Sequence, residues 1–455
     1  MMEFSMLIIA VFVIGYFFIA IESITKVNKA AIAILMCVLC WSIYSIGCMN
    51  GMILPGELFG QGGLSDIHDL NHVIEEALGE AGTTLFFLMG AMTVVEIVDQ
   101  HGGLNFVSDL IMSRHKRKLL WRMVFMTALL SAMLDNLTTS IVMVMILRKL
   151  VPEAKERLYF DVAIIIAANS GGAFSPIGDV TTIMLWNGKQ ITAGGVISHI
   201  LLPALVSFVV PAAIFHTKLH GAWVLPTTKE ERAAARPSLV TRNQRREIFT
   251  IGVGGLCLVP LFHLYTELPP FMGILLVLGV LWFLTEVIYR KKDENDPMAK
   301  RVSQVLGKID MTTILFFLGI LMAVSVLGKI NALTTLGTFL NEVSGGNNYL
   351  VTGVIGVLSS IVDNVPLVAA SMGMYEVNPM IADFAQDGTF WQLLAYCAGV
   401  GGSMLIIGSA AGVVVMGIEG ISFGWYMKHA SWIALLGYLA GILCFWLQQS
   451  VMALF

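Results

Sequence analysis

The chain has 455 residues, of which 57% are hydrophobic and 13% are charged, and its formal net charge is -4 at pH 7. A soluble globular domain carries about twice this fraction of charged residues. Together with a mean hydropathy of +0.81, this composition excludes a soluble domain and indicates a protein whose core forms in lipid.

Apolar segments of about 20 residues, long enough to cross a bilayer, recur along the whole chain. The first is interpreted as a retained span with its N-terminus outside, because no Lys or Arg precedes it and Lys26 and Lys29 follow it. Ten segments are long enough, and we expect each to span the membrane: 5–23, 30–49, 82–100, 158–188, 193–215, 247–265, 271–289, 311–328, 389–418 and 424–452.

Residues 56–81, between the second and third spans, are expected to form an external amphipathic helix with Ser65 as its N-cap. His68 and His72 lie four residues apart on this helix. The pattern is typical of a solvated surface helix, and a metal site or an external pH sensor is kept as the alternative.

Two further apolar stretches, 119–150 and 349–375, are too long for one helix and too short for two. Each carries an Asp-Asn pair at its midpoint, Asp135-Asn136 in MLDNLTTS and Asp363-Asn364 in IVDNVPLVAAS. A carboxylate at the centre of a membrane segment costs about 2.5–3.5 kcal/mol. Two such pairs at matching places therefore predict a functional use.

The basic residues predict how these two stretches are oriented. Both flanks of 119–150 are rich in Lys and Arg, whereas the flanks of 349–375 contain none. Because basic residues favour the cytoplasmic side, we expect two re-entrant hairpins that enter from opposite sides. Only Lys189 and Lys329, of the 27 basic residues, then lie outside.

Each hairpin is followed by a span with a glycine-rich break, NSGGAFSPIGDVTT in the first half and GVGGSMLIIGSAAG in the second. We therefore predict an all-α polytopic membrane protein with an inverted-topology repeat, two re-entrant hairpins, two broken transmembrane helices and about 10 full spans. The predicted divisions are a first repeat over 1–216, a cytoplasmic linker over 217–246 and a second repeat over 247–455.

Non-helical backbone at membrane depth requires protein or water to satisfy its carbonyls, and those carbonyls are good ligands for a hard cation. The polar side chains at the first hairpin tip and break all offer oxygen or amide groups: Asp135, Asn136, Thr138, Thr139, Asn169, Ser170, Ser175, Asp179, Thr181 and Thr182. The corresponding set in the second half is Asp363, Asn364, Ser371, Ser403 and Ser409. Oxygen ligands suit Na⁺ or Li⁺ rather than a transition metal.

Asp179 is the leading candidate for a titrating ion ligand, because its counterpart in the second half is Ser409 and the repeat itself does not require a carboxylate. Burial disfavours the charged form of a carboxyl group and a bound cation favours it, so H⁺ and Na⁺ compete for one group. The alternative is that these Asp and Asn residues cap helix N-termini. The sequence lacks a phosphate-binding loop, so ATP is not expected to drive transport, and neither a cofactor nor catalysis is expected.

The duplicated Asp-Asn motifs together with NSGGAFSPIGDVTTIMLW at 169–186 resemble the NhaD family of bacterial sodium/proton antiporters over essentially the whole chain. The resemblance implies exchange of internal Na⁺ or Li⁺ for external H⁺ across the bacterial inner membrane, favoured at alkaline pH. It also implies a lipid-embedded homodimer with a scaffold domain and a mobile transport domain, and no nucleic-acid partner. It implies ten functional positions: Asp135, Asn136, Asn169, Asp179, Thr181, Thr182, Asp363, Asn364, Ser403 and Ser409. We expect Na⁺ at Asp135, Asn136, Asp179, Asp363 and Asn364.

A sodium-coupled anion carrier of the dicarboxylate type, or an arsenite exporter on the same fold, is the alternative. Dicarboxylate carriers resemble this layout but have Ser-Asn-Thr at both tips, where this chain has Asp-Asn-Leu and Asp-Asn-Val. Carboxylates at both tips repel an anion, which disfavours this alternative. A non-transporting scaffold or an ion channel would not need the inverted pair.

Overall fold

The computed structural model describes residues 2–20, 22–49, 67–103, 107, 110–113, 115–151, 153–221, 241–290, 301–361 and 364–452. Within these residues the regular structure is helical. The first half contains α1 (Met2–Ala20), α2 (Glu22–Thr25), α3 (Lys29–Met49), α4 (Ile67–Gln100), α6 (Lys116–Ser131), α7 (Asn136–Leu150), α8 (Ala154–Ala173), α9 (Val180–Asn187) and α10 (Ala193–Lys218).

The second half contains the remaining elements: α12 (Arg242–Thr266), α13 (Pro270–Tyr289), α14 (Val302–Leu306), α15 (Met311–Lys329), α16 (Ala332–Ser344), α17 (Asn348–Leu358), α18 (Asn364–Met374), η1 (Ala382–Phe384), α19 (Thr389–Gly401), α20 (Ala410–Glu419), α21 (Phe423–Tyr426), η2 (Met427–Ser431) and α22 (Trp432–Met452). Of the linker expected over 217–246, residues 222–240 lie outside the described part.

Among the residues that the structure describes, seven helices are long and apolar enough to cross a membrane. They correspond to seven of the ten expected spans. The other three expected spans are α1, the pair α8–α9 and the pair α19–α20. In each of the two pairs, an irregular segment separates the helices. A chain with this many apolar helices is a multi-pass membrane protein, whereas the full count of ten spans stays a prediction.

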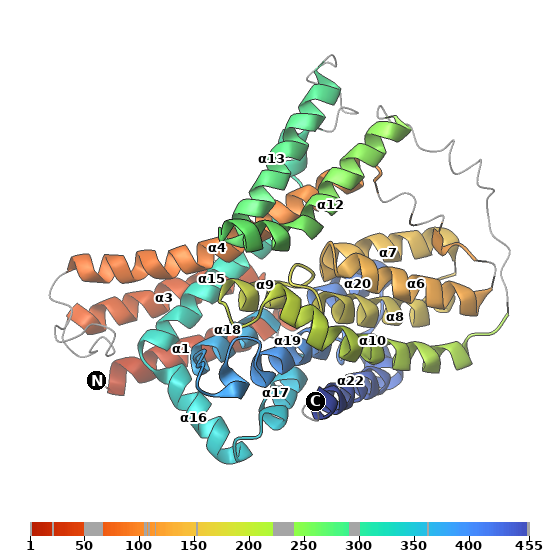
Figure 1. Cartoon of the computed structure of the whole chain (residues 1–455). Helices are drawn as coiled ribbons and strands as arrows, with labels where there is room; N and C mark the ends of the chain where they lie inside the picture. Colours follow the sequence, from red (N-terminus) through yellow and green to blue (C-terminus); the bar gives the residue numbers. More distant parts are fainter. Residues whose placement is uncertain are drawn as a thin grey trace.

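The helices form two groups that draw on both halves of the sequence (Figure 1). In one group α1, α3, α4, α12, α13 and α15 pack on one another; in the other, α6, α7, α8, α10, α17, α19, α20 and α22 do. Helices α9 and α18 lie between the groups, since α9 contacts α4 and α18 contacts α15. The predicted site residues at the starts of α9 and α18 therefore lie near the border between the two groups of helices.

The irregular segment between α8 and α9 packs against the end of α6, and the one between α19 and α20 packs in the same way against the turn after α17. A Cβ atom on Gly178 would lie 2.6 Å from the carbonyl oxygen of Ser131, and one on Gly408 would lie 2.5 Å from that of Ser360. Gly171 and Gly401 approach the backbone of Ala128 and Gly356 just as closely. Only glycine allows such an approach of two backbones, which explains why both breaks share the same glycine spacing.

Two local features differ from the sequence-based expectation. The expected external helix and the span after it form one continuous helix, α4, of 34 residues. His72 is exposed, in agreement with a surface helix, whereas Ser65 and the His68 side chain lie outside what the structure describes. Helix α16 was not expected; its apolar Leu333 and Leu336 recur at helical spacing, but the segment is too short to register as a span.

Candidate functional site

Asp179 is the centre of a buried polar cluster. Its Oδ2 accepts hydrogen bonds from Nδ2 of Asn136 (3.0 Å) and from Nδ2 of Asn364 (3.3 Å). Its Oδ1 accepts from the backbone N–H and the hydroxyl of Thr181, both at 3.0 Å. The Asp179 side chain is 2% exposed. One carboxylate thus receives an amide from each Asp-Asn pair.

Asn169, in the middle of α8, extends this cluster toward the second break. Its Oδ1 accepts from Nδ2 of Asn136 at 3.2 Å. Its Nδ2 donates to the hydroxyls of Ser403 and Ser409, each at 2.9 Å. All these side chains are buried. A continuous hydrogen-bonded path therefore leads from Asp179 through both breaks.

The breaks place these groups because a new helix begins directly after each of them. Asp179 is the N-cap of α9 and accepts from Thr181 N–H, and Ser409 is the N-cap of α20 and accepts from Gly412 N–H. A helix N-terminus carries a partial positive charge and unpaired N–H groups, which favour a carboxylate. The two caps occupy equivalent places, but only the first is an ionisable group.

Asp135 is oriented differently. Its carboxylate caps α7, accepting from Thr138 N–H at 2.7 Å and from the Thr138 hydroxyl at 2.8 Å. Its backbone has a φ of 145°, which an L residue rarely adopts. The capping alternative raised from the sequence thus describes the contacts of Asp135, and its role as a Na⁺ ligand stays a prediction. Its counterpart Asp363 lies outside the described residues.

Three other predicted site residues, Ser170, Thr182 and Thr139, are also buried, and their surroundings differ from those of Asn136 and Asn169. Ser170 accepts from the Ser207 hydroxyl of α10. The Thr182 hydroxyl donates to the carbonyls of Ser175 and Asp179 and so braces the first break. Within the described part of the chain, the Thr139 hydroxyl has no hydrogen-bond partner.

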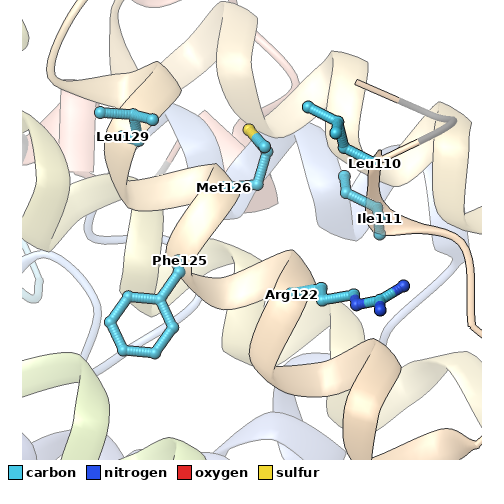
Figure 2. A pocket seen from close by; sticks show the side chains of 6 residues that line it. All are labelled: Leu110, Ile111, Arg122, Phe125, Met126 and Leu129. Atoms are coloured by element: carbon cyan, nitrogen blue, oxygen red, sulfur yellow. The ribbon is translucent and has the colours of Figure 1, made fainter. Parts of the chain in front are cut away.

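A cleft of about 590 Å³ reaches one end of this cluster. Its wall includes Leu137 beside the first tip, Ser409 of the second break, and Glu22, Lys26 and Asp310 from the other helix group. A second hollow of about 240 Å³ lies on α6 between Arg122, Phe125, Leu129 and Leu110 (Figure 2). It is lined mainly by apolar side chains and shares no residue with the cluster.

The groups that the cluster offers as ligands to a cation are one carboxylate, three amides and several hydroxyls. No group of three or more His, Cys, Asp or Glu side chains that could hold a metal occurs among the residues described. Oxygen ligands of this kind suit a hard monovalent cation. An Asn amide presents N–H₂ on one side and oxygen on the other, so rotation of the amides of Asn136 and Asn364 would turn oxygen toward a cation at Asp179.

Sequence reasoning missed one buried charged group, formed by Asp161 and Arg157 on α8 and Glu419 at the end of α20. The signal was present, because Asp161 stands in the otherwise apolar run YFDVAIIIAA. It was overlooked because it has no counterpart in the second half.

Comparison with known proteins places the chain among transporters. The model of the citrate transporter family, CitMHS, matches residues 6–385. Sodium/proton antiporters 1 and 2 of Arabidopsis thaliana are 44% and 41% identical to it, each over 95% of this chain and over 70% and 97% of their own lengths. The Na⁺/H⁺ antiporter NhaD of Alkalimonas amylolytica is 28% identical over 95% of this chain and 88% of its own length.

Among solved structures, the YdaH transporter of Alcanivorax borkumensis matches 92% of this chain and 98% of its own with a TM-score of 0.56. The identity is 13%, so this likeness concerns the fold alone.

Proposed function

Since the chain belongs to the citrate transporter family and, within it, to the sodium/proton antiporters similar to NhaD, we propose that this transport protein exchanges Na⁺ or Li⁺ for H⁺. The observation that carries the proposal is the convergence of Asn136 and Asn364 on the single carboxylate of Asp179. A site with one titratable group can hold a proton or a cation but not both. This is the condition that exchange requires.

In the proposed cycle Asp179 is the group for which H⁺ and Na⁺ compete. Loss of the proton leaves a buried carboxylate, which is costly unless hydrogen bonds or a cation neutralise it. The four donors from Asn136, Asn364 and Thr181 stabilise the ionised form between the two occupied states. Na⁺ then binds the carboxylate together with amide and hydroxyl oxygens and is displaced when the proton returns.

The proposed architecture is an inverted-topology repeat with two re-entrant hairpins, α6–α7 and α17–α18. It is supported by equivalent backbone contacts in the two halves. Gly171 approaches Ala128 as Gly401 approaches Gly356, and Gly178 and Gly408 each approach the turn that ends the first helix of their own hairpin. The stretch TTLFFLMGAM at 83–92 in the second half of α4 also resembles TTILFFLGILM at 312–322 in α15, and the two helices pack against one another. We divide the chain into repeats over 1–216 and 247–455, joined by a cytoplasmic linker over 217–246.

The cleft beside Ser409 is proposed to be the route from the cytoplasm. Its wall contains Lys26 and Asp310 from loops and Lys29 from the start of α3, and the distribution of basic residues favours the inside for all three. On this basis the structure corresponds to the state that is open to the inside.

We place the protein in a bacterial inner membrane with both termini outside, as a homodimer. The placement is supported by the NhaD relatives and by the lopsided distribution of Lys and Arg. The sodium-coupled anion carrier is disfavoured, because the cluster centres on the carboxylate of Asp179 and each Asp-Asn pair adds another carboxylate, and these groups repel an anion.

The test is reconstitution of the purified protein in liposomes that contain a pH-sensitive dye. Exchange predicts that Na⁺ or Li⁺ added on one side moves protons in the opposite direction, in the absence of any anion substrate. Sodium uptake that requires citrate or another carboxylate and moves no protons would support the carrier instead.

A further inference from the structure

Asp161 is a carboxylate at membrane depth that the proposed exchange site does not use. It lies in the first half of α8 and is 0% exposed. Across the described part of the chain, neither of its oxygens has a hydrogen-bond partner. An ionised carboxylate without a donor is strongly disfavoured in such a place, so the group requires a ligand that neutralises it.

The charged groups around Asp161 come from three helices: Arg157 of α8, Arg148 of α7 and Glu419 of α20. Glu419 holds the guanidinium of Arg157 through contacts of 2.7 and 2.8 Å to its Oε2. Arg148 reaches the other oxygen of Glu419 at 3.4 Å. Arg157 also donates to the carbonyl of Val151. The basic groups in reach are therefore engaged by Glu419, and Asp161 is left without a donor.

This arrangement makes the charge of Asp161 and the Arg157–Glu419 ion pair mutually dependent. With a proton on Asp161, one carboxylate faces Arg157 and the pair is undisturbed. Without that proton, two carboxylates share the same guanidinium and repel one another. Ionisation of Asp161 therefore weakens the contact between Arg157 and Glu419.

The weakened contact belongs to the same pair of helices that builds the exchange site. Asn169 lies eight residues after Asp161 on α8, about 12 Å along the axis at about 1.5 Å per residue. Ser409 caps the start of α20 and Glu419 ends it. Helices α8 and α20 are thus joined at one end by Asn169 and Ser409 and at the other by Arg157 and Glu419.

We propose that Asp161 is a second proton-binding site, distinct from Asp179, and that loss of its proton releases α20 from α8 and activates transport. The activating effect rests on the proposed exchange function, whereas the proton site itself does not. The ligand is H⁺ taken from the cytoplasmic side, where Arg148 and Arg157 place this end of α8.

Infrared difference spectroscopy of the purified protein in lipid tests the proton site directly. A pH step should reveal the carbonyl band of a protonated carboxyl group that disappears at high pH, and Asp161→Asn should remove this band. Asp383→Asn, which alters an exposed carboxylate of η1, is the control and should leave the band in place. A difference spectrum that is the same in Asp161→Asn and the parent would overturn the assignment.

Exchange rates in liposomes test the activation. Asp161→Asn imitates the protonated form, so its exchange at alkaline pH should stay at the rate that the parent shows near neutral pH. Glu419→Gln frees Arg157 for Asp161 and should move activation to lower pH by about one unit. Parent-like pH profiles in both variants would overturn the regulatory role. A parent that shows the Asp161 band but no exchange would contradict the proposed function and support the proton site.

Discussion

The side-chain amide of Asn364 lies 3.3 Å from Oδ2 of Asp179, although 185 residues separate them in the chain. Asn364 is the second residue of the second Asp-Asn pair and opens α18, and Asp179 precedes α9 in the first half. The contact therefore joins the two halves of the chain at one carboxylate. Any movement that separates the start of α18 from the start of α9 must break it, so the proposed exchange couples ion occupancy to conformation at this contact.

Replacement of Asp179 by Asn should abolish exchange while the protein still inserts, because it removes the one carboxylate on which both halves converge. Asn keeps the size of the side chain and can still cap α9. Proton movement on addition of Na⁺ to liposomes is the measurement. Asp383→Asn, at an exposed position, serves as the matched control. Exchange at the parental rate in Asp179→Asn would move this residue to a structural role.

Asn364→Ala should weaken Na⁺ binding by about tenfold to a hundredfold, which corresponds to the loss of a hydrogen bond or ligand to a charged group. Calorimetric titration with Na⁺ measures the change. Asn378→Ala is the control, since the Asn378 side chain accepts from the backbone N–H of Met380 in a loop and has no contact with the cluster in the described part of the chain. Equal affinities for Na⁺ in Asn364→Ala and the parent would exclude Asn364 from the site.

Asp135 and Asp363 can be tested through the carrier-like pattern. Ser is a good N-cap, so Asp135→Ser should keep α7 intact and remove only the charge. We expect the double variant with Asp363→Ser to bind Na⁺ more weakly, because two negative charges are lost, and to show a smaller but remaining dependence of Na⁺ binding on pH, because Asp179 is still present. Unchanged Na⁺ binding at all pH values in the double variant would confine both residues to capping.

The close backbone approach at the second break predicts a clear effect on stability. Gly401→Ala would force a methyl group against the backbone of Gly356 and should lower the free energy of unfolding by about 1–3 kcal/mol. Gly417→Ala on α20 is the control, because a Cβ atom there meets no atom within 4 Å. Thermal unfolding in detergent compares the two. A Gly401→Ala variant as stable as Gly417→Ala would contradict the close packing.

The proposed topology is checked with cysteines introduced into a variant without the six native ones. Met380→Cys, at a position that is 93% exposed, should react with an impermeant reagent added outside. Asn243→Cys, in the first turn of α12, should react only after the membrane is opened. The reverse pattern would invert the assignment of both hairpins.

Much of the helical layout could be predicted because hydropathy and the glycine-rich breaks depend on local sequence. The seven long spans overlap those expected, and the breaks begin at or just after the paired glycines, after Ala173 in the first half and after Gly401 in the second. The continuity of α4 was not predicted. Its polar first half has the pattern of a separate surface helix, and the change from polar to apolar residues does not show whether a turn lies between the two halves.

The composition of the site was predictable, whereas its geometry was not. Repeat symmetry singled out Asp179, since the second half has Ser409 in its place. That Asn136 and Asn364 both reach Asp179, while Asp135 turns back onto Thr138, depends on how the halves pack together. The comparison of the two repeats could not predict Asp161, because this residue has no counterpart in the second half of the chain.

The central claim is that Na⁺ and H⁺ compete for the carboxylate of Asp179. Calorimetric titration of the purified protein with Na⁺ at a series of pH values, in buffers of different ionisation enthalpy, tests it most directly. Competition predicts that one proton is released per Na⁺ bound and that the apparent Kd for Na⁺ falls by about tenfold per pH unit while the site is protonated. Na⁺ binding that is independent of pH and releases no proton would contradict it.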